Sequence, residues 1–89
     1  MTFHQMNPRK LLKKLARGDL HNVSFAEMVN LVKSFGFTLK RTAGSHHIFT
    51  HPDIPELINL QNAGGEAKPY QIRQFLRLIE KYNIHLEDS

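Results

Sequence analysis

The stretch FTLKRTAGSHHIFTH, residues 37–51, decides the fold of this chain. Apolar and polar side chains alternate over residues 37–42, which is the period-two pattern of a strand with one buried face. Alternation places Phe37 and Leu39 on one face and Thr38, Lys40 and Thr42 on the other. Residues 43–45 are typical of a short hairpin loop, and residues 46–51, HHIFTH, are then a second predicted strand. The stretch therefore predicts an antiparallel β-hairpin.

The segment after the hairpin predicts a third strand and a closing helix. Residues 51–55 hold two prolines, which cannot continue a regular ladder, so the third strand is expected over residues 56–60, ELINL. A polar loop follows over residues 61–68. Pro69 then begins a helix over residues 69–83, whose apolar face is made by Ile72, Phe75, Leu76 and Ile79.

Two further helices are predicted before the hairpin. Ser24 and Glu27 match a capping box, and the helix that they begin is expected to end at Gly36. Asn7 as an N-cap and Gly18 as a stop bound a shorter helix. This shorter helix is basic and contains Arg9, Lys10, Lys13, Lys14 and Arg17. Two interpretations of it stay open, a packing helix with a solvated face and a surface for phosphate contact.

The order of these elements predicts an α+β fold. Helices at both ends of a small antiparallel sheet indicate a two-layer domain with its helices on one side of a three-stranded sheet. The other face of the sheet is then available to a partner. At 89 residues the chain holds one small domain at most. We expect residues 1–23 to be an N-terminal extension that carries the basic helix, and residues 24–89 to be the main domain.

Composition favours an anionic partner and excludes several kinds of site. The chain contains twelve Lys and Arg and eight Asp and Glu, which gives a formal net charge of +4. This charge suits a nucleic-acid partner, although a protein with a basic solvated surface has the same composition. The absence of cysteine excludes disulfides, thiolate zinc sites and a cysteine nucleophile. No apolar run approaches the ~18 residues of a spanning helix, and no signal-peptide pattern is present. We therefore expect a cytoplasmic protein without a membrane partner.

Three histidines lie in the second predicted strand, and alternation disfavours a metal site among them. His46 and His47 point to opposite faces, and His47 and His51 share a face but lie roughly 13 Å apart. A single catalytic histidine fits this geometry better, because histidine can give or take a proton near neutral pH. The alternative is that they are half-buried or edge residues of the sheet. The other histidines are expected to be exposed: His4, His21 and His85.

The turn before these histidines is a candidate phosphate site. Gly44 and Ser45 place backbone N–H groups and a hydroxyl near the imidazoles, in a loop beside a strand start. No carboxylate pair, nucleophile elbow, phosphate-binding loop or dinucleotide fingerprint is present, so no cofactor is expected.

A helix that ends in SFGF, the basic hairpin TLKRTAGSHHIF, a third strand and a closing amphipathic helix together resemble the HicA family of toxins from bacterial and archaeal toxin–antitoxin pairs. The resemblance covers residues 26–84. It implies a fold like a double-stranded-RNA-binding domain, mRNA endoribonuclease activity that needs no ribosome, and a HicB-like antitoxin that covers the site. The active histidine of the family is the fourth residue of a Gly-Ser-x-His motif, which is His47 here, with His46 at the variable third position.

The chain departs from the family pattern in two places. Compact family members begin near Ala26, so residues 1–23 are additional. Family members often have a Pro-x-His step after the third strand, whereas residues 59–74, NLQNAGGEAKPYQIRQ, contain no histidine. A second assisting histidine is therefore absent from that segment.

The expected site is built around His47 as the general acid or base, without a metal. Gly44, Ser45 and the adjacent His46 would form the phosphate pocket. Cations would neutralise or contact phosphate at Lys40, Arg41, Lys68, Arg73 and Arg77. Two alternatives remain, a non-catalytic module that binds double-stranded RNA by its shape, and a module that binds an acidic protein partner.

Overall fold

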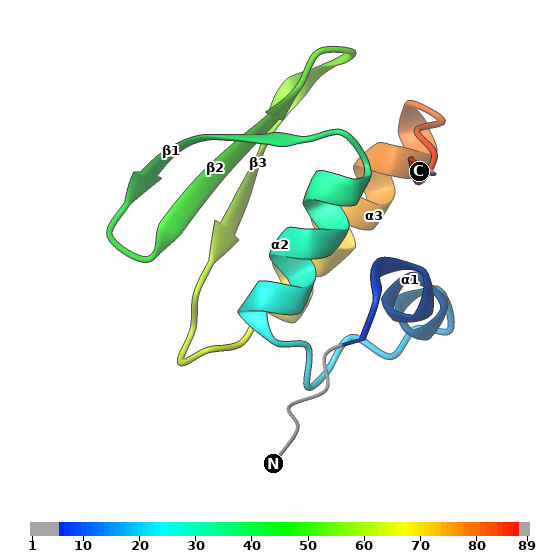
Figure 1. Ribbon diagram of the computed structural model, residues 1–89, viewed down its shortest axis with the longest axis vertical. Helices are drawn as coiled ribbons and strands as arrows, with labels where there is room; N and C mark the ends of the chain where they lie inside the picture. The colour runs from blue at the N-terminus through cyan, green and yellow to red at the C-terminus, as the bar shows by residue number, and fades with distance from the viewer. Residues whose placement is uncertain (1–5, 88–89) are drawn as a thin grey trace.

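The computed structural model describes residues 6–87, and the elements within this range follow the predicted order (Figure 1). The fold is a small α+β domain with a three-stranded antiparallel sheet, as the sequence predicts. The helices and strands are α1 (Pro8–Ala16), α2 (Phe25–Ser34), β1 (Thr38–Ala43), β2 (His46–His51), β3 (Ile54–Gln61) and α3 (Pro69–Lys81). No helix in the described range is long and apolar enough to cross a membrane.

The sheet has the order β1-β2-β3, and its third strand begins earlier than predicted. β3 starts at Ile54 and includes Pro55, although the prolines predicted a start at residue 56. Pro55 is tolerated because β3 is an edge strand that pairs only with β2. The register is also irregular there, between Phe49 and His51 of β2.

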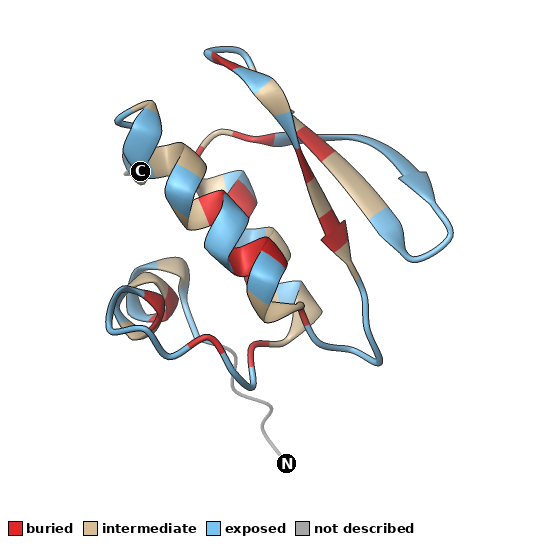
Figure 2. Ribbon diagram, turned by 180° about the vertical axis from the view of Figure 1, so that it is seen from behind, coloured by how far each residue is buried: buried red, intermediate tan, exposed pale blue. Residues whose placement is uncertain are grey.

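Helices α2 and α3 cover one face of the sheet, and the other face is open (Figure 1). The buried residues lie mainly on the inner sides of the helices, β2 and β3, whereas β1 is exposed along its whole length (Figure 2). Three aromatic rings join the layers: Phe75 of α3 contacts Phe35 and Phe37, with ring centroids 5.4 and 5.7 Å apart. Edge-to-face contacts of this kind add to the stabilisation that apolar burial gives.

The two ends of α2 are fixed by local sequence. The Ser24 hydroxyl accepts the Glu27 N–H at 3.0 Å, and the Glu27 carboxylate accepts the Ser24 N–H at 3.1 Å, which confirms the predicted capping box. At the other end Gly36 has a φ of +93°, which favours glycine. A Cβ there would lie 2.9 Å from the end of the Glu87 side chain, which can move aside, so the positive φ is the main reason for glycine at this position.

Helix α1 lies outside these two layers, on the far side of α2 from the sheet (Figures 1 and 2). The Asn7 side chain accepts the Lys10 N–H at 2.9 Å and caps the helix, as predicted. Leu11 and Leu15 are buried and join the core of the domain. The described part of the N-terminal extension, from residue 6 onward, therefore packs as part of the same folded unit.

Candidate functional site

His47 stands where the start of β2 meets the start of α2. Its ring is half-buried and packs on Phe25, the first residue of α2, with ring centroids 4.7 Å apart. Its Nδ1 lies 3.1 Å from the carbonyl oxygen of Ser45. A carbonyl oxygen only accepts, so Nδ1 carries the proton of the neutral imidazole and Nε2 keeps its lone pair. This arrangement leaves Nε2 as the atom that can take a proton.

The Ser45 carbonyl is itself held in place by the loop after β3. It also accepts the backbone N–H of Asn62 at 2.9 Å. The Asn62 side chain accepts the N–H of Gly65 at 2.7 Å, and the carbonyl of Gly65 accepts the N–H of Phe25 at 2.8 Å. Hydrogen bonds therefore run from the start of α2 through this loop to Ser45, which orients His47.

His46 belongs to the other face of the sheet. Its Nδ1 lies 3.2 Å from the side-chain oxygen of Asn59 in β3, and the residue is exposed. The two neighbouring histidines therefore point to opposite faces and lie in different surroundings, as strand alternation predicts.

Among the described residues, the remaining histidines do not join this site. His51 packs on Phe37 with ring centroids 5.0 Å apart, and its Nδ1 accepts the N–H of Asp53 at 3.0 Å, which is a structural set of contacts. His21 and His85 are exposed, and His4 lies outside the described residues. Across residues 6–87, no three His, Asp or Glu side chains converge as metal ligands would.

The basic residues of the hairpin lie away from the face of His47. Arg41 is directly opposite Ile48, and residues opposite each other in an antiparallel pair share a face. Arg41 therefore shares the open face with His46, while Lys40 lies at a β-bulge between Leu39 and Arg41.

Lys68 is the predicted cation that the fold brings closest to the start of α2. It is the N-cap residue of α3, and the adjacent Ala67 donates its N–H to the carbonyl of Val23 at 2.9 Å. Arg73 and Arg77 are exposed further along α3. The structure thus joins Ser45 to His47, ties the backbone next to Lys68 to the segment before α2, and places the two arginines further along α3.

Gly44 and Ser45 form the exposed turn beside His47. Gly44 has a φ of +60°, and no atom lies within 4 Å of a Cβ built on it. Its conformation, and not a close contact, is therefore what favours glycine at this position. The Ser45 side chain is exposed next to it.

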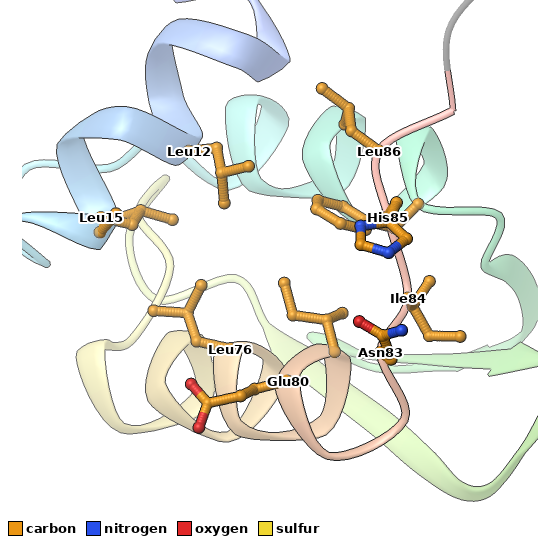
Figure 3. Close-up of a pocket in the computed structure, with 11 residues that line it drawn as sticks. Leu12, Leu15, Leu76, Glu80, Asn83, Ile84, His85 and Leu86 are labelled. Atoms are coloured by element: carbon orange, nitrogen blue, oxygen red, sulfur yellow. The ribbon is translucent and has the colours of Figure 1, made fainter.

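An apolar pocket of about 530 Å³ lies elsewhere, between α1, α3 and the segment after α3 (Figure 3). Leu12 and Leu15 of α1 face Leu76 of α3 across it, and Glu80 lies at its rim. None of the predicted site residues lines this pocket. It is therefore separate from the site around His47.

Sequence reasoning missed two residues of the site, Phe25 and Asn62. The helical spacing of Phe25 predicts a core residue, but this ring is half-buried and contacts His47 instead. Its position directly after the N-cap, at the end of the apolar stripe, is the one signal that could have separated it from the core residues. Asn62 carries no such signal, because it reaches Ser45 only through the pairing of β2 with β3.

The model of the HicA toxin family, toxins of bacterial toxin–antitoxin systems, matches residues 25–80, from the first residue of α2 almost to the end of α3. No curated protein and no solved structure matches the chain. The matched segment covers more than half of the chain and contains His47, its turn and the loop that holds it. The chain therefore belongs to the HicA family of toxins from bacterial toxin–antitoxin systems.

Proposed function

We propose that this toxin is an endoribonuclease that cleaves mRNA with His47 as its single catalytic side chain and without a metal ion. The observation that carries the proposal is the hydrogen bond of His47 Nδ1 to the Ser45 carbonyl, which leaves Nε2 as a base. The exposed Gly-Ser turn beside it offers room for a phosphate. Family membership supports a toxin with a cognate antitoxin.

The chemistry uses a nucleophile that the RNA supplies. Nε2 of His47 takes the proton of a 2′-OH, whose oxygen then forms a bond to the adjacent phosphorus. The bond from phosphorus to the 5′ oxygen breaks, and that oxygen takes up a proton from the imidazolium or from water. The products are a 2′,3′-cyclic phosphate and a 5′-hydroxyl. One well-placed general base contributes roughly 10²–10⁴-fold to such a reaction.

The phosphate is bound by groups around the turn. N–H groups at Gly44 and Ser45 and the Ser45 hydroxyl are donors for its oxygens, and such donors stabilise the charge that develops in the transition state. Lys68 lies on the same end of the domain. More distant parts of the RNA strand would contact Arg41 and His46 on the open face, Lys40 at the bulge of β1, and Arg73 and Arg77 on α3.

Family membership supports a cognate antitoxin, and we propose that it binds at the same end of the domain. A HicB-like antitoxin that covers the end of the domain around His47 excludes RNA from the half-buried imidazole. The expected inhibition is therefore competitive with RNA, and the measurement is toxin cleavage at rising RNA concentration with antitoxin present.

The test compares two neighbouring histidines that face apart. His47→Ala is expected to lose roughly 10²–10⁴-fold in kcat for RNA cleavage, because the base is removed. His46→Ala is the matched control and is expected to keep most of the activity, since its side chain is on the other face. Cleavage is expected to persist in EDTA and to produce cyclic phosphate ends.

Full activity of the His47→Ala variant would overturn the catalytic assignment. Loss in the His46 variant alone would move the role to that residue. Salt-sensitive RNA binding without cleavage by the unmodified protein would identify a binding module instead.

A further inference from the structure

The positive charge of this protein is concentrated in its N-terminal helix. Five of the twelve Lys and Arg lie within residues 9–17, which contain no Asp or Glu. The rest of the chain contains the other seven Lys and Arg and all eight Asp and Glu. Without this segment the protein would carry no net positive charge, so the net positive charge of the chain comes from α1 and its C-cap residue Arg17.

Among the described residues, 6–87, three of these cations have no acidic partner. Lys10, Lys13 and Arg17 are exposed, and no carboxylate within residues 6–87 lies at ion-pair distance from them. Lys14 differs, because it bonds to the His21 carbonyl and lies 3.6 Å from Asp19. The uncommitted cations are therefore on the outer surface of α1.

The stability of α1 accounts for these charges only in part. Lys13 lies in the last turn and Arg17 at the C-cap, where the helix dipole favours a cation. Lys10–Lys14 and Lys13–Arg17 are like-charge pairs four residues apart, a spacing at which like charges destabilise a helix. Lys10 also lies in the first turn, where the helix dipole disfavours a cation and where no acidic residue is present. Packing uses Leu11 and Leu15 on the opposite side. An anionic partner would bind these exposed cations favourably and relieve their mutual repulsion.

Helix α1 begins at the end of the domain that holds His47. The N–H of Met6, just before α1, donates to the Glu27 carboxylate at 2.7 Å. Phe25, in the same first turn of α2, contacts His47. From this point the nine residues of α1 extend over ~13 Å, beside α2 (Figure 1). A strand of several nucleotides can therefore contact both His47 and α1.

We propose that α1 is a second RNA-contacting surface, which binds phosphates of the substrate strand outside the catalytic centre through Lys10, Lys13 and Arg17. The identity of the ligand, RNA, rests on the proposed ribonuclease function. The location of the binding surface rests only on the charge and exposure of α1. Binding by α1 would therefore raise the affinity for RNA of any sequence, because phosphate contacts carry no direct sequence information. Substrate length then controls KM, since a short RNA at His47 does not reach α1.

The experiment compares two double variants that remove the same charge. Lys10→Gln with Lys13→Gln removes two cations from α1, and Lys33→Gln with Lys81→Gln removes two exposed helix cations elsewhere. Each protein is assayed with a single-stranded RNA of about 20 nucleotides and with a dinucleotide. The α1 pair is expected to raise KM for the long RNA about tenfold at low salt, as two lost phosphate contacts should. The kcat, and cleavage of the dinucleotide, are expected to stay unchanged.

The control pair is expected to change KM for the long RNA less than twofold. The slope of log K against log salt for binding of the long RNA is expected to fall by about 1.4 in the α1 pair only, at about 0.7 for each phosphate. Like-charge repulsion is removed in the α1 pair, so its melting temperature should not fall, and reduced RNA binding cannot then be attributed to unfolding.

Equal effects of the two double variants would overturn the proposal, as would slower dinucleotide cleavage in the α1 pair. Unchanged RNA binding together with weaker antitoxin binding would overturn it too and assign α1 to the protein partner. If the unmodified protein binds RNA without cleaving it, the ribonuclease function fails, and the salt slope for binding still decides whether α1 contacts RNA.

Discussion

Among single residues, Gln71 connects α3 to the edge of the sheet next to the site. It is the one buried polar side chain of the described residues, with 2% of its surface exposed. Its side-chain oxygen accepts the N–H of Gln61, the last residue of β3, at 2.8 Å. The next residue, Asn62, is the donor to the Ser45 carbonyl that orients His47. A buried amide on α3 therefore supports the loop that positions the imidazole.

Replacing Gln71 with Leu is expected to lower the free energy of unfolding by about 1–3 kcal/mol, because the Gln61 N–H loses its acceptor in a partly buried place. Gln74→Leu, on the same helix but exposed, is the control and should change it by less than ~0.5 kcal/mol. Chemical denaturation measures both. Equal costs for the two variants would show that the hydrogen bond contributes nothing.

At the scale of the element, Glu27 joins two helices through one carboxylate. Burial acts to raise the pKa of Glu27, but the N–H groups of Met6 and Ser24 donate to the carboxylate and lower this pKa below its usual value of 4.5. A carboxyl whose pKa is lowered on folding contributes stability above its unfolded pKa. That contribution is lost as the pH falls through the folded pKa, so it fades below about pH 4.5.

Glu27→Gln is therefore expected to reduce the free energy of unfolding by about 0.5–1.5 kcal/mol at pH 7, because the amide has one acceptor oxygen for the two N–H groups that the carboxylate accepts. The difference from the unmodified protein should shrink below pH 4.5, where the native carboxyl also becomes neutral. Thermal unfolding at pH 7 and pH 3.5 measures this, with the exposed Glu80→Gln as control. A difference that stays constant with pH would contradict the role of the charge.

The β-bulge in β1 places Arg41 on the opposite face of the sheet from His47. Strict alternation from Leu39 would put Arg41 on the face that the helices cover. The register shift between these two residues turns Arg41 to the open face and places Thr42 opposite His47. Bulges depend on how two strands pair, and a one-residue shift reverses the faces of all residues that follow.

For the whole molecule, the N-terminal helix completes the core of a short chain. Leu11 and Leu15 of α1 belong to the same buried cluster as the residues between α2, α3 and the sheet. A small domain buries a limited share of its surface, so each additional buried leucine is a substantial part of its stability. The division of the chain into residues 1–23 and 24–89 stays a prediction.

Leu15→Ala is expected to lower the free energy of unfolding by about 2–5 kcal/mol, the usual cost of such a core truncation. Leu12→Ala, one helical turn away and only partly buried at the rim of the apolar pocket, should cost clearly less. Chemical denaturation of both variants measures the difference. Similar small costs would show that α1 does not contribute to the core.

The sequence by itself determined the order of the elements, the caps of α1 and α2, the hairpin and the opposite facing of His46 and His47. These features follow from residues a few positions apart, through side-chain period, capping and turn chemistry. Only the tertiary structure decided that Phe25 packs on His47, that Asn62 holds the Ser45 carbonyl, and that Arg41 lies on the other face. Those contacts join residues far apart in the chain, and they depend on strand register and helix packing, which no local pattern specifies.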